Sequence, residues 1–290
     1  MPELPEVETV RRGLESLIVG RIVKSAVSDT PKSFPNAPAD IASFLIGSKI
    51  IHIRRRAKVL MIDLDNGYTL MVHLKMTGQL VFRDGDVAFG AGHPSNSLIG
   101  ELPDKSTRVI LEFTDGSRLF FNDQRKFGWM KLLPSIEIPN IDFMKKVGPE
   151  PLEDNFTSAD FEARFKRRAK TSIKAALLDQ TVVAGVGNIY ADESLWGAKI
   201  HPQRLVGSLS SKDYALLYAE LRAVMNLAIE KGGSTDKNYV NAEGKRGSYM
   251  DFARVFRREG KPCPRCGTTI IKFKASGRGT HICPYCQKQP

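Results

Sequence analysis

The segment VLMIDLDNGYTLMVHL (residues 59–74) sets the architecture of the first half of this chain. Two runs of β-branched and large apolar residues, Val59–Leu64 and Thr69–Leu74, flank the pair Asn66-Gly67. Asn and Gly tolerate the positive φ angles of a two-residue turn better than other residues do. The segment therefore predicts a β-hairpin.

The same pattern recurs throughout residues 21–133. The runs Arg108–Phe113 and Leu119–Asn122 flank Asp115-Gly116, which is a second two-residue turn signal. Short runs joined by tight turns are typical of antiparallel sheets. We therefore expect residues 21–133 to form mostly antiparallel β-structure, arranged as a sandwich or a flattened barrel.

Helical patterns flank this β-region on both sides. Residues 2–19 carry apolar side chains at helical spacing, and four further helices are expected at 158–168, 172–179, 188–196 and 211–231. Four prolines in residues 134–151 indicate a linker, and the polar residues 232–250 indicate a loop. The pattern as a whole predicts an α+β multidomain protein with an N-terminal helix, a β-sandwich and a helical domain.

The charge of the chain favours a polyanionic partner. Forty-three Lys and Arg residues face 32 Asp and Glu residues, which gives a formal net charge of +11. Such a charge attracts phosphates through Coulomb steering and counterion release. We see no basic amphipathic helix, no secretory leader and no apolar run of the roughly 18 residues that span a membrane. The expected partner is therefore nucleic acid, without a membrane, in the cytoplasm.

All four cysteines lie in the last 28 residues, as Cys263-x2-Cys266 and Cys283-x2-Cys286 separated by sixteen residues. Two such pairs can converge on one tetrahedral Zn²⁺, and four thiolates leave no open position for water. Two disulfides or a redox pair would not explain both pairs at this spacing in a reducing compartment. The pattern predicts one structural zinc held by the two cysteine pairs, and two short strands are expected nearby at 269–274 and 280–283.

Two further segments suit phosphate groups. Ala184-Gly185-Val186-Gly187-Asn188 follows a helical stretch rather than a strand, so it does not indicate a dinucleotide fold, and no organic cofactor is expected. A helix that begins near Asn188 would instead offer free N–H groups to a phosphate, although Asn188 could simply cap that helix. The basic segment 272–279, between the cysteine pairs, predicts a phosphate-contacting hairpin rather than a solvated turn.

Six motifs together resemble the formamidopyrimidine-DNA glycosylase family, over essentially the whole chain. They are MPELPEVE (1–8), HLKMTG (73–78), DQRKFG (123–128), GPEPL (148–152), the run Gln180–Glu193 and GRGT (277–280) beside the cysteines. The resemblance implies a catalytic β-sandwich domain at 1–133 and a linker at 134–151. It further implies a helix–two-turn–helix domain with a lesion-recognition loop at 152–254, and a zinc-finger hairpin at 255–290.

The resemblance implies a bifunctional glycosylase and abasic-site lyase that excises 8-oxoguanine and formamidopyrimidines from duplex DNA in base excision repair. It also implies that Met1 is removed, that the Pro2 amine attacks C1′ of the damaged nucleotide, and that β,δ-elimination cuts the strand. The implied catalytic residues further include Glu3, as the general acid, and Lys58 and Arg278. Taken alone, Pro2-Glu3 would be read as a favourable helix start.

The resemblance also assigns DNA contacts. Met76, Arg125 and Phe127 fill the gap that the flipped nucleotide leaves, and the Arg125 fork suits cytosine opposite the lesion. The phosphate contacts implied are Lys58, His73, Asn188 and Arg278. Without the motifs, Met76, Phe127 and His73 would be interpreted as core residues. Residues 232–250 correspond to the segment that closes over the flipped base.

Two other functions fit part of this pattern. An endonuclease VIII-type glycosylase for oxidised pyrimidines uses the same proline, but it typically opens Pro-Glu-Gly, whereas this chain has Leu4 at that position. A non-catalytic zinc-finger protein would need the positive charge but not Pro2-Glu3.

The expected partner is damaged double-stranded DNA, and the expected form is a monomer in the bacterial cytoplasm, associated with the nucleoid.

Overall fold

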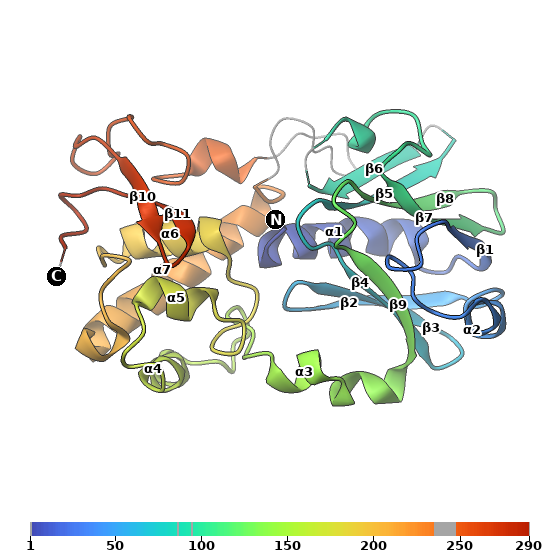
Figure 1. The fold of residues 1–290 in the computed structure, drawn as a ribbon, viewed down its shortest axis with the longest axis horizontal. Helices are drawn as coiled ribbons and strands as arrows, with labels where there is room; N and C mark the ends of the chain where they lie inside the picture. Colours follow the sequence, from blue (N-terminus) through green and yellow to red (C-terminus); the bar gives the residue numbers. More distant parts are fainter. Residues whose placement is uncertain (1, 86, 94, 235–247, 290) are drawn as a thin grey trace. The chain divides into compact units, whose positions relative to one another are not determined.

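The computed structural model describes residues 2–85, 87–93, 95–234 and 248–289 (Figure 1). The chain divides into two compact units. We refer to the described part of 1–145 and 229–248 as the β-unit, and to that of 146–228 and 249–290 as the helical unit. Within the described residues, no helix combines the length and the apolarity that a membrane span requires.

The β-unit contains two antiparallel sheets, which confirms the predicted sandwich. The first sheet has the order β1 (Val23–Ser28), β7 (Thr107–Phe113), β8 (Arg118–Asp123), β5 (Gly78–Asp84) and β6 (Val87–Gly92). The second has the order β2 (Ile50–Arg56), β3 (Val59–Leu64), β4 (Tyr68–His73) and β9 (Trp129–Pro134).

Both predicted hairpins are present. Asn66-Gly67 joins β3 to β4, and Asp115-Gly116 joins β7 to β8. Gly67 has a φ of 80° and Gly116 a φ of 88°, but Asn66 and Asp115 do not have positive φ angles. The hairpins are therefore confirmed, whereas the two-residue turn with positive φ at both residues is wrong, and only the glycine uses its conformational freedom. The two hairpins place β3–β4 in one sheet and β7–β8 in the other.

Helix α1 (Leu4–Ile18) lies in the core between the two sheets (Figure 1). It contacts β5 and β6 of one sheet and β2 and β3 of the other. Val7, Val10 and Leu14 are at most 1% exposed. The predicted helix at 2–19 is thus confirmed, but it begins at Leu4 because Glu3 has extended backbone angles at the N-cap.

Two short helical regions were not anticipated. Helix α2 (Pro38–Phe44) lies between β1 and β2 in the chain, and its proline occupies the first turn, where no N–H is needed. The predicted linker 134–151 contains the 3₁₀ segment η2 (Ser135–Asn140) and the helix α3 (Asp142–Lys146). Ile138 of η2 packs against β3 and β4, so the start of this segment belongs to the sandwich.

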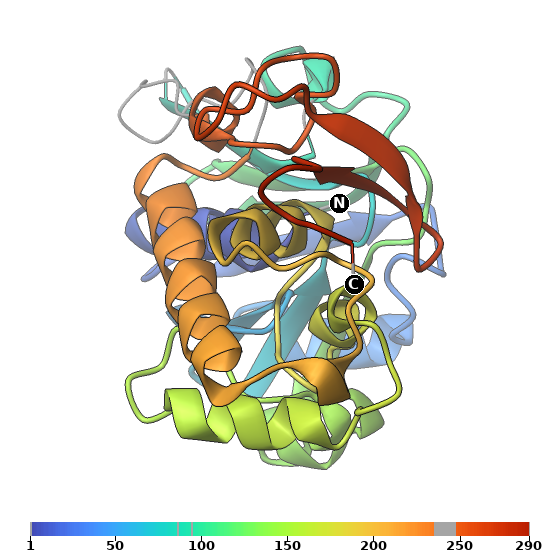
Figure 2. The same ribbon diagram turned by 90° about the vertical axis from the view of Figure 1, so that its left-hand side faces the viewer.

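The helical unit holds the four predicted helices, with α7 extending slightly beyond it. They are α4 (Ser158–Lys166), α5 (Ile173–Leu178), α6 (Asn188–Gly197) and α7 (Ser211–Glu230). Two 3₁₀ segments, η3 (Val206–Ser208) and η4 (Tyr249–Phe252), accompany them. The zinc-finger hairpin is formed by β10 (Ile271–Ala275) and β11 (Arg278–Ile282), drawn in red in Figure 2. Most of the predicted loop, residues 235–247, lies outside the described residues.

Gly13 offers a test of how tightly α1 is packed. A Cβ atom at this position would lie 2.2 Å from ring atoms of the buried Phe89. Gly-to-Ala changes inside a helix normally stabilise by about 1 kcal/mol. We expect Gly13→Ala to destabilise instead, by about 1–3 kcal/mol, because overpacking outweighs the gain in propensity. The measurement is the free energy of unfolding in urea.

Ser16→Ala on the exposed side of the same helix is the control, and it should be neutral or slightly stabilising. A Gly13→Ala protein more stable than the wild type would contradict the tight packing of α1 against β6.

Candidate functional sites

Two crossovers between the sheets carry the residues implied to enter DNA. Residues 74–77 take the chain from β4 in one sheet to β5 in the other, and residues 124–128 return it from β8 to β9. Because β4 pairs with β9 and β5 pairs with β8, the two crossovers are neighbours. We call them the paired crossovers. Met76 lies on the first, and Arg125 and Phe127 lie on the second.

On the second of the paired crossovers, the side chains of Arg125 and Phe127 face solvent rather than the core. Phe127 is 46% exposed, and the Arg125 guanidinium lies 5.0 Å from the centre of its ring. Arg125 is exposed and Met76 is half-buried. The core interpretation is therefore wrong for Phe127. An exposed aromatic ring stacked with an arginine is suited to insertion between bases.

Lys58 and His73 occupy the same end of the four-stranded sheet. Lys58 immediately precedes β3, whose first residue, Val59, pairs with His73 at the end of β4. The Nδ1 atom of His73 accepts a hydrogen bond from the Lys75 backbone N–H at 3.0 Å. Burial, together with the charges of Lys75 and Lys58, lowers the pKa of His73 to about 3. His73 is therefore neutral at physiological pH, with its proton on Nε2, where it can be donated to a phosphate oxygen.

The N-terminus is fixed by a residue whose role the sequence analysis did not identify. Pro2 is buried, and Glu3 is 3% exposed. The Glu3 backbone N–H donates to Glu6 Oε2 at 2.7 Å, and the Ser234 N–H donates to Glu6 Oε1 at 2.8 Å. Glu6 thus ties the start of α1 to the start of the loop that begins at 232. A Glu three residues after the N-cap was the available sequence signal.

In the helical unit, the two predicted phosphate-binding elements contact each other. Asn188 is the first residue of α6, and Gly187 occupies the N-cap, so the interpretation of Asn188 as the cap is wrong. Its Nδ2 atom donates to the Gly279 carbonyl of β11 at 2.9 Å. Ser276-Gly277 form the hairpin turn with positive φ, and the exposed Arg278 follows it. Asn188 and Arg278 are therefore held close together.

A buried ion pair attaches this hairpin to the helices. Lys174 Nζ of α5 lies 2.6 Å from Asp192 Oδ1 of α6, and both side chains are fully buried. Lys174 also donates to the Thr280 hydroxyl at 2.7 Å, and the His281 backbone N–H donates to Asp192 Oδ2 at 2.9 Å. No sequence pattern distinguishes these two charged residues from solvent-exposed ones, so the pair could not be predicted from the sequence.

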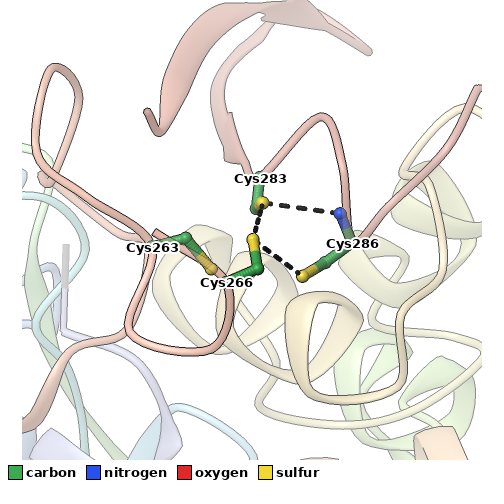
Figure 3. A group of neighbouring side chains, drawn as sticks. All are labelled: Cys263, Cys266, Cys283 and Cys286. Carbon is green, nitrogen blue, oxygen red and sulfur yellow. Dashed lines mark hydrogen bonds between the residues drawn. The ribbon is translucent and has the colours of Figure 1, made fainter. Parts of the chain in front are cut away.

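The four cysteines form a metal site of the predicted kind (Figure 3). Their Sγ atoms all lie within 4.8 Å of one another, with separations of 3.4 and 3.5 Å from Cys266 to Cys283 and Cys286. A disulfide would be about 2.05 Å long. Zinc–sulfur bonds of about 2.3 Å place tetrahedral sulfurs roughly 3.8 Å apart, which matches. The residues fit zinc, and the disulfide interpretation is wrong.

A small core supports the metal site. Cys263 and Cys283 are buried together with Val255, Ile270 and Trp196 of α6. The Arg265 guanidinium lies 3.9 Å from the centre of a Trp196 ring and donates to the Trp196 carbonyl at 3.0 Å. The first cysteine knuckle is therefore anchored to the helix that begins at Asn188.

Comparison with known proteins places the chain in a family. Models described as the Formamidopyrimidine-DNA glycosylase N-terminal domain, its H2TH domain and the Zinc finger found in FPG and IleRS match residues 1–130, 147–239 and 260–289. The formamidopyrimidine-DNA glycosylase of Listeria innocua is 42% identical over 289 residues, covering 99% of this chain and 100% of that protein. The chain belongs to the formamidopyrimidine-DNA glycosylase family.

Solved structures from the family have the same fold. A complex of a mutant of the Lactococcus lactis FPG protein with Fapy-dG-containing DNA is 35% identical, with a TM-score of 0.88, and covers 99% of this chain and all of that one. A complex of the same organism's enzyme with abasic-site DNA has a TM-score of 0.87 at the same identity and coverage. The family match to the zinc finger and the cysteine cluster together identify one structural zinc.

Removing one zinc ligand should abolish metal binding and weaken DNA binding. We expect Cys266→Ser to contain far less than one zinc per chain by atomic emission, because three thiolates hold the ion less well and metal binding supplies most of the folding energy of so small a module. Affinity for duplex DNA should fall with it. Ser208→Ala, a change far from the cysteines in the sequence, is the control. A zinc-free protein with full DNA affinity would refute the role of the finger.

The neutral state of His73 predicts a pH effect on stability. The folded-state pKa, about 3, lies below the ordinary value of 6.5, so protonation favours the unfolded chain. The stability from this residue is present above pH 6.5 and is lost as the pH falls towards 3. Between pH 7 and pH 5, the unfolding free energy of the wild type should drop by about 1–2 kcal/mol more than that of His73→Asn. Equal pH dependence would show that His73 titrates normally.

Proposed function

We propose that this chain excises oxidised purines, 8-oxoguanine and formamidopyrimidines, from duplex DNA and then cuts the strand by β,δ-elimination, in base excision repair. The observation that carries the proposal is the fixed N-terminus: Pro2 is buried beside Glu3, and Glu6 holds the peptide group that joins them. The family relatives from Lactococcus lactis that bind Fapy-dG DNA and abasic-site DNA support it.

The chemistry begins with the amine of Pro2, once Met1 has been removed. An α-amino group has a reference pKa of roughly 7.7–8.0, so a useful fraction is unprotonated at neutral pH. Attack of this amine on C1′ displaces the damaged base, which leaves with a proton. A secondary amine then gives an iminium ion, which has no N–H proton to lose. This electron sink makes the C2′–H acidic, so elimination can break the strand on both sides of the sugar.

We assign Glu3 the proton transfer at the sugar ring oxygen. Glu3 directly follows the nucleophile, and its backbone N–H is bound by Glu6. A general acid must lie within hydrogen-bond reach of the atom that it protonates, and adjacency to Pro2 provides this reach. Protonation opens the sugar and makes C1′ more electrophilic, so Glu3 contributes to catalysis rather than to DNA affinity.

The paired crossovers supply what must replace the flipped nucleotide. Opening the stack costs a few kcal/mol, and apolar side chains inserted into the step offset this cost. Met76 and Phe127 are these side chains in our proposal, and Arg125 pairs with the widowed base. Cytosine offers its O2 and N3 acceptors to the guanidinium fork, whereas adenine offers N1 beside an N6 donor. Excision opposite cytosine is therefore preferred.

Four residues contact phosphates in this proposal: Lys58 and His73 in the β-unit, and Asn188 and Arg278 in the helical unit. We also count Lys58 and Arg278 among the catalytic residues, each through the phosphate that it contacts. The Asn188–Gly279 hydrogen bond supports a joint role for Asn188 and Arg278, since it keeps the α6 N-terminus beside the hairpin. Binding should weaken steeply with salt as counterions compete for these phosphates.

We further propose a division of labour along the chain. Residues 1–133 perform the chemistry, residues 152–254 bind the DNA backbone through the helix–two-turn–helix element, and residues 255–290 form the zinc finger, with 134–151 as the linker. The loop 232–250 covers the flipped base, and the bond from Ser234 to Glu6 brings its start next to the catalytic end of α1. The protein acts as a monomer on bacterial chromosomal DNA in the cytoplasm.

Borohydride trapping tests the proposal directly. Protein whose mature N-terminus is verified as Pro2 is mixed with an 8-oxoguanine:cytosine duplex and reduced. We expect a covalent complex, because borohydride reduces the iminium to a stable amine, and peptide mapping should place the DNA adduct on Pro2. Undamaged duplex should give none. The readout is a gel shift of labelled DNA together with the mass of the N-terminal peptide.

The matched control keeps Pro2 and removes only its free amine. A variant with an uncleaved N-terminal extension turns the Pro2 nitrogen into an amide, which cannot attack C1′, and it should bind damaged DNA without being trapped. No trapped complex from the verified wild type would favour a non-catalytic zinc-finger protein. Preferential trapping on an oxidised pyrimidine would favour the endonuclease VIII-type activity.

A further inference from the structure

The carboxylate of Asp123 connects the paired crossovers. Asp123 is the last residue of β8 and is fully buried. Its Oδ1 atom accepts hydrogen bonds from the Thr77 hydroxyl on the first crossover and from the Arg125 backbone N–H on the second, the latter at 3.2 Å. Its Oδ2 atom accepts from the Gly128 N–H at 2.6 Å. One side chain therefore binds both crossovers at three points.

Thr77 closes this arrangement. Its hydroxyl also accepts from the Arg125 N–H, at 3.1 Å, while it donates to Asp123. Thr77, Asp123 and Arg125 thus form a closed triangle in which the donors are a hydroxyl and a backbone N–H. Asp123 only accepts hydrogen bonds here, and a carboxylate can accept at both of its oxygens. Hydrogen bonds to a charged acceptor are also stronger than those to a neutral one, so a carboxylate holds the crossovers better than an amide would.

Each crossover contains backbone that needs such support. Lys75, directly before Met76, has a φ of 50°, and Lys126, between Arg125 and Phe127, has a φ of 57°. Residues with side chains adopt this left-handed conformation only when the surrounding structure holds it. The turns that present the DNA-facing side chains are therefore strained at equivalent places.

Glycines at the ends of the crossovers show how closely the chain segments approach. A Cβ atom on Gly78 would lie 2.3 Å from the Leu74 carbonyl oxygen. A Cβ atom on Gly128 would lie 2.7 Å from the Phe121 ring and 3.1 Å from Asp123 Oδ2. There is no room for either crossover to shift while these contacts persist, so Asp123 sits at the centre of a tightly packed junction.

We infer that Asp123 is a positioning residue that joins the two crossovers into one rigid wedge, so that Met76, Arg125 and Phe127 enter the DNA together and the fork of Arg125 is aimed at the opposite base. The inference rests on the proposed function of these three side chains. A preformed wedge does not have to be ordered at the moment of insertion, which lowers the cost of opening the duplex. Asp123 thereby sets the discrimination between cytosine and adenine opposite the lesion.

Asp123→Asn tests the inference with the least change of shape. An amide replaces one accepting oxygen with an N–H₂ donor, so at least one of the bonds from Thr77, Arg125 or Gly128 is lost. We expect the single-turnover rate of 8-oxoguanine excision opposite cytosine to fall about tenfold or more. The ratio of the rates opposite cytosine and adenine should fall towards that of Arg125→Ala. Cleavage of a preformed abasic site in single-stranded DNA, where there is no gap to fill and no opposite base, should stay within about twofold of the wild type.

Asp115→Asn is the matched control, because Asp115 is a carboxylate in the turn that precedes β8, whereas Asp123 ends this strand. It accepts hydrogen bonds from the Ser117 N–H at 3.0 Å and from the Ser117 hydroxyl at 2.6 Å, in the β7–β8 turn. This change should leave the rates and the cytosine-to-adenine ratio unaltered. Thr77→Ser keeps the hydroxyl and should behave like the wild type, whereas Thr77→Val should reproduce part of the Asp123→Asn defect.

The possible outcomes separate the inference from the function on which it rests. If Asp123→Asn lowers duplex excision and single-strand cleavage alike and keeps the base ratio, Asp123 is merely structural and the inference is overturned. If the wild type shows no preference for cytosine, or Arg125→Ala keeps the preference, the proposed role of Arg125 fails, whatever Asp123→Asn does. Loss of the ratio in Asp123→Asn with intact single-strand cleavage supports the inference.

Discussion

Burial of α1 between two sheets is the constraint on which the rest of the β-unit depends. Val7, Val10 and Leu14 are each almost fully buried, and burying one such side chain contributes about 1.5–3 kcal/mol. The helix cannot slide or tilt without exposing them. Because Pro2 and Glu3 directly precede its first turn, the position of the proposed nucleophile is set by core packing rather than by a loop. Catalytic groups gain precision when rigid elements hold them.

The sandwich also leaves backbone N–H groups without strand partners where the chain crosses between the sheets, and Asp123 accepts hydrogen bonds from two of them. Two sheets that enclose a helix must be joined by segments that leave one ladder before they enter the other, and the backbone N–H groups in between lose their strand partners. The N–H groups of Arg125 and Gly128 are two such donors, and the Asp123 carboxylate accepts both. The polar group that satisfies the crossing is therefore also the one that holds the side chains of Arg125 and Phe127 outwards. The same hydrogen bonds of Asp123 therefore serve both the fold and the proposed recognition of DNA.

Local chemistry explains how much of this could be predicted from the sequence. Asn66-Gly67 predicts its hairpin, and the paired cysteines predict their metal site, because the residues of each pattern lie within or directly beside the structure that they form. The partners of Glu6, Lys174 and Asp123 that lie far away in the chain carry no such signal. Ser234 is 228 residues from Glu6 in the chain, and Thr77 is 46 residues from Asp123, so only the fold reveals that they meet. The short helices α2 and α3 were missed because a single turn or two leaves no periodicity to detect.

The buried ion pair connects the zinc finger to helices α5 and α6. The attraction within a buried Lys–Asp pair offsets the free-energy cost of desolvating both charges only when their other donors and acceptors also have hydrogen-bond partners. Lys174 and Asp192 obtain that satisfaction from β11, through the Thr280 hydroxyl and the His281 N–H. The strand β11 runs directly into the second pair of cysteine ligands. The ion pair therefore connects the segment that leads to the metal site with α5 and with α6, the helix that begins at Asn188, even though no cysteine lies in either helix.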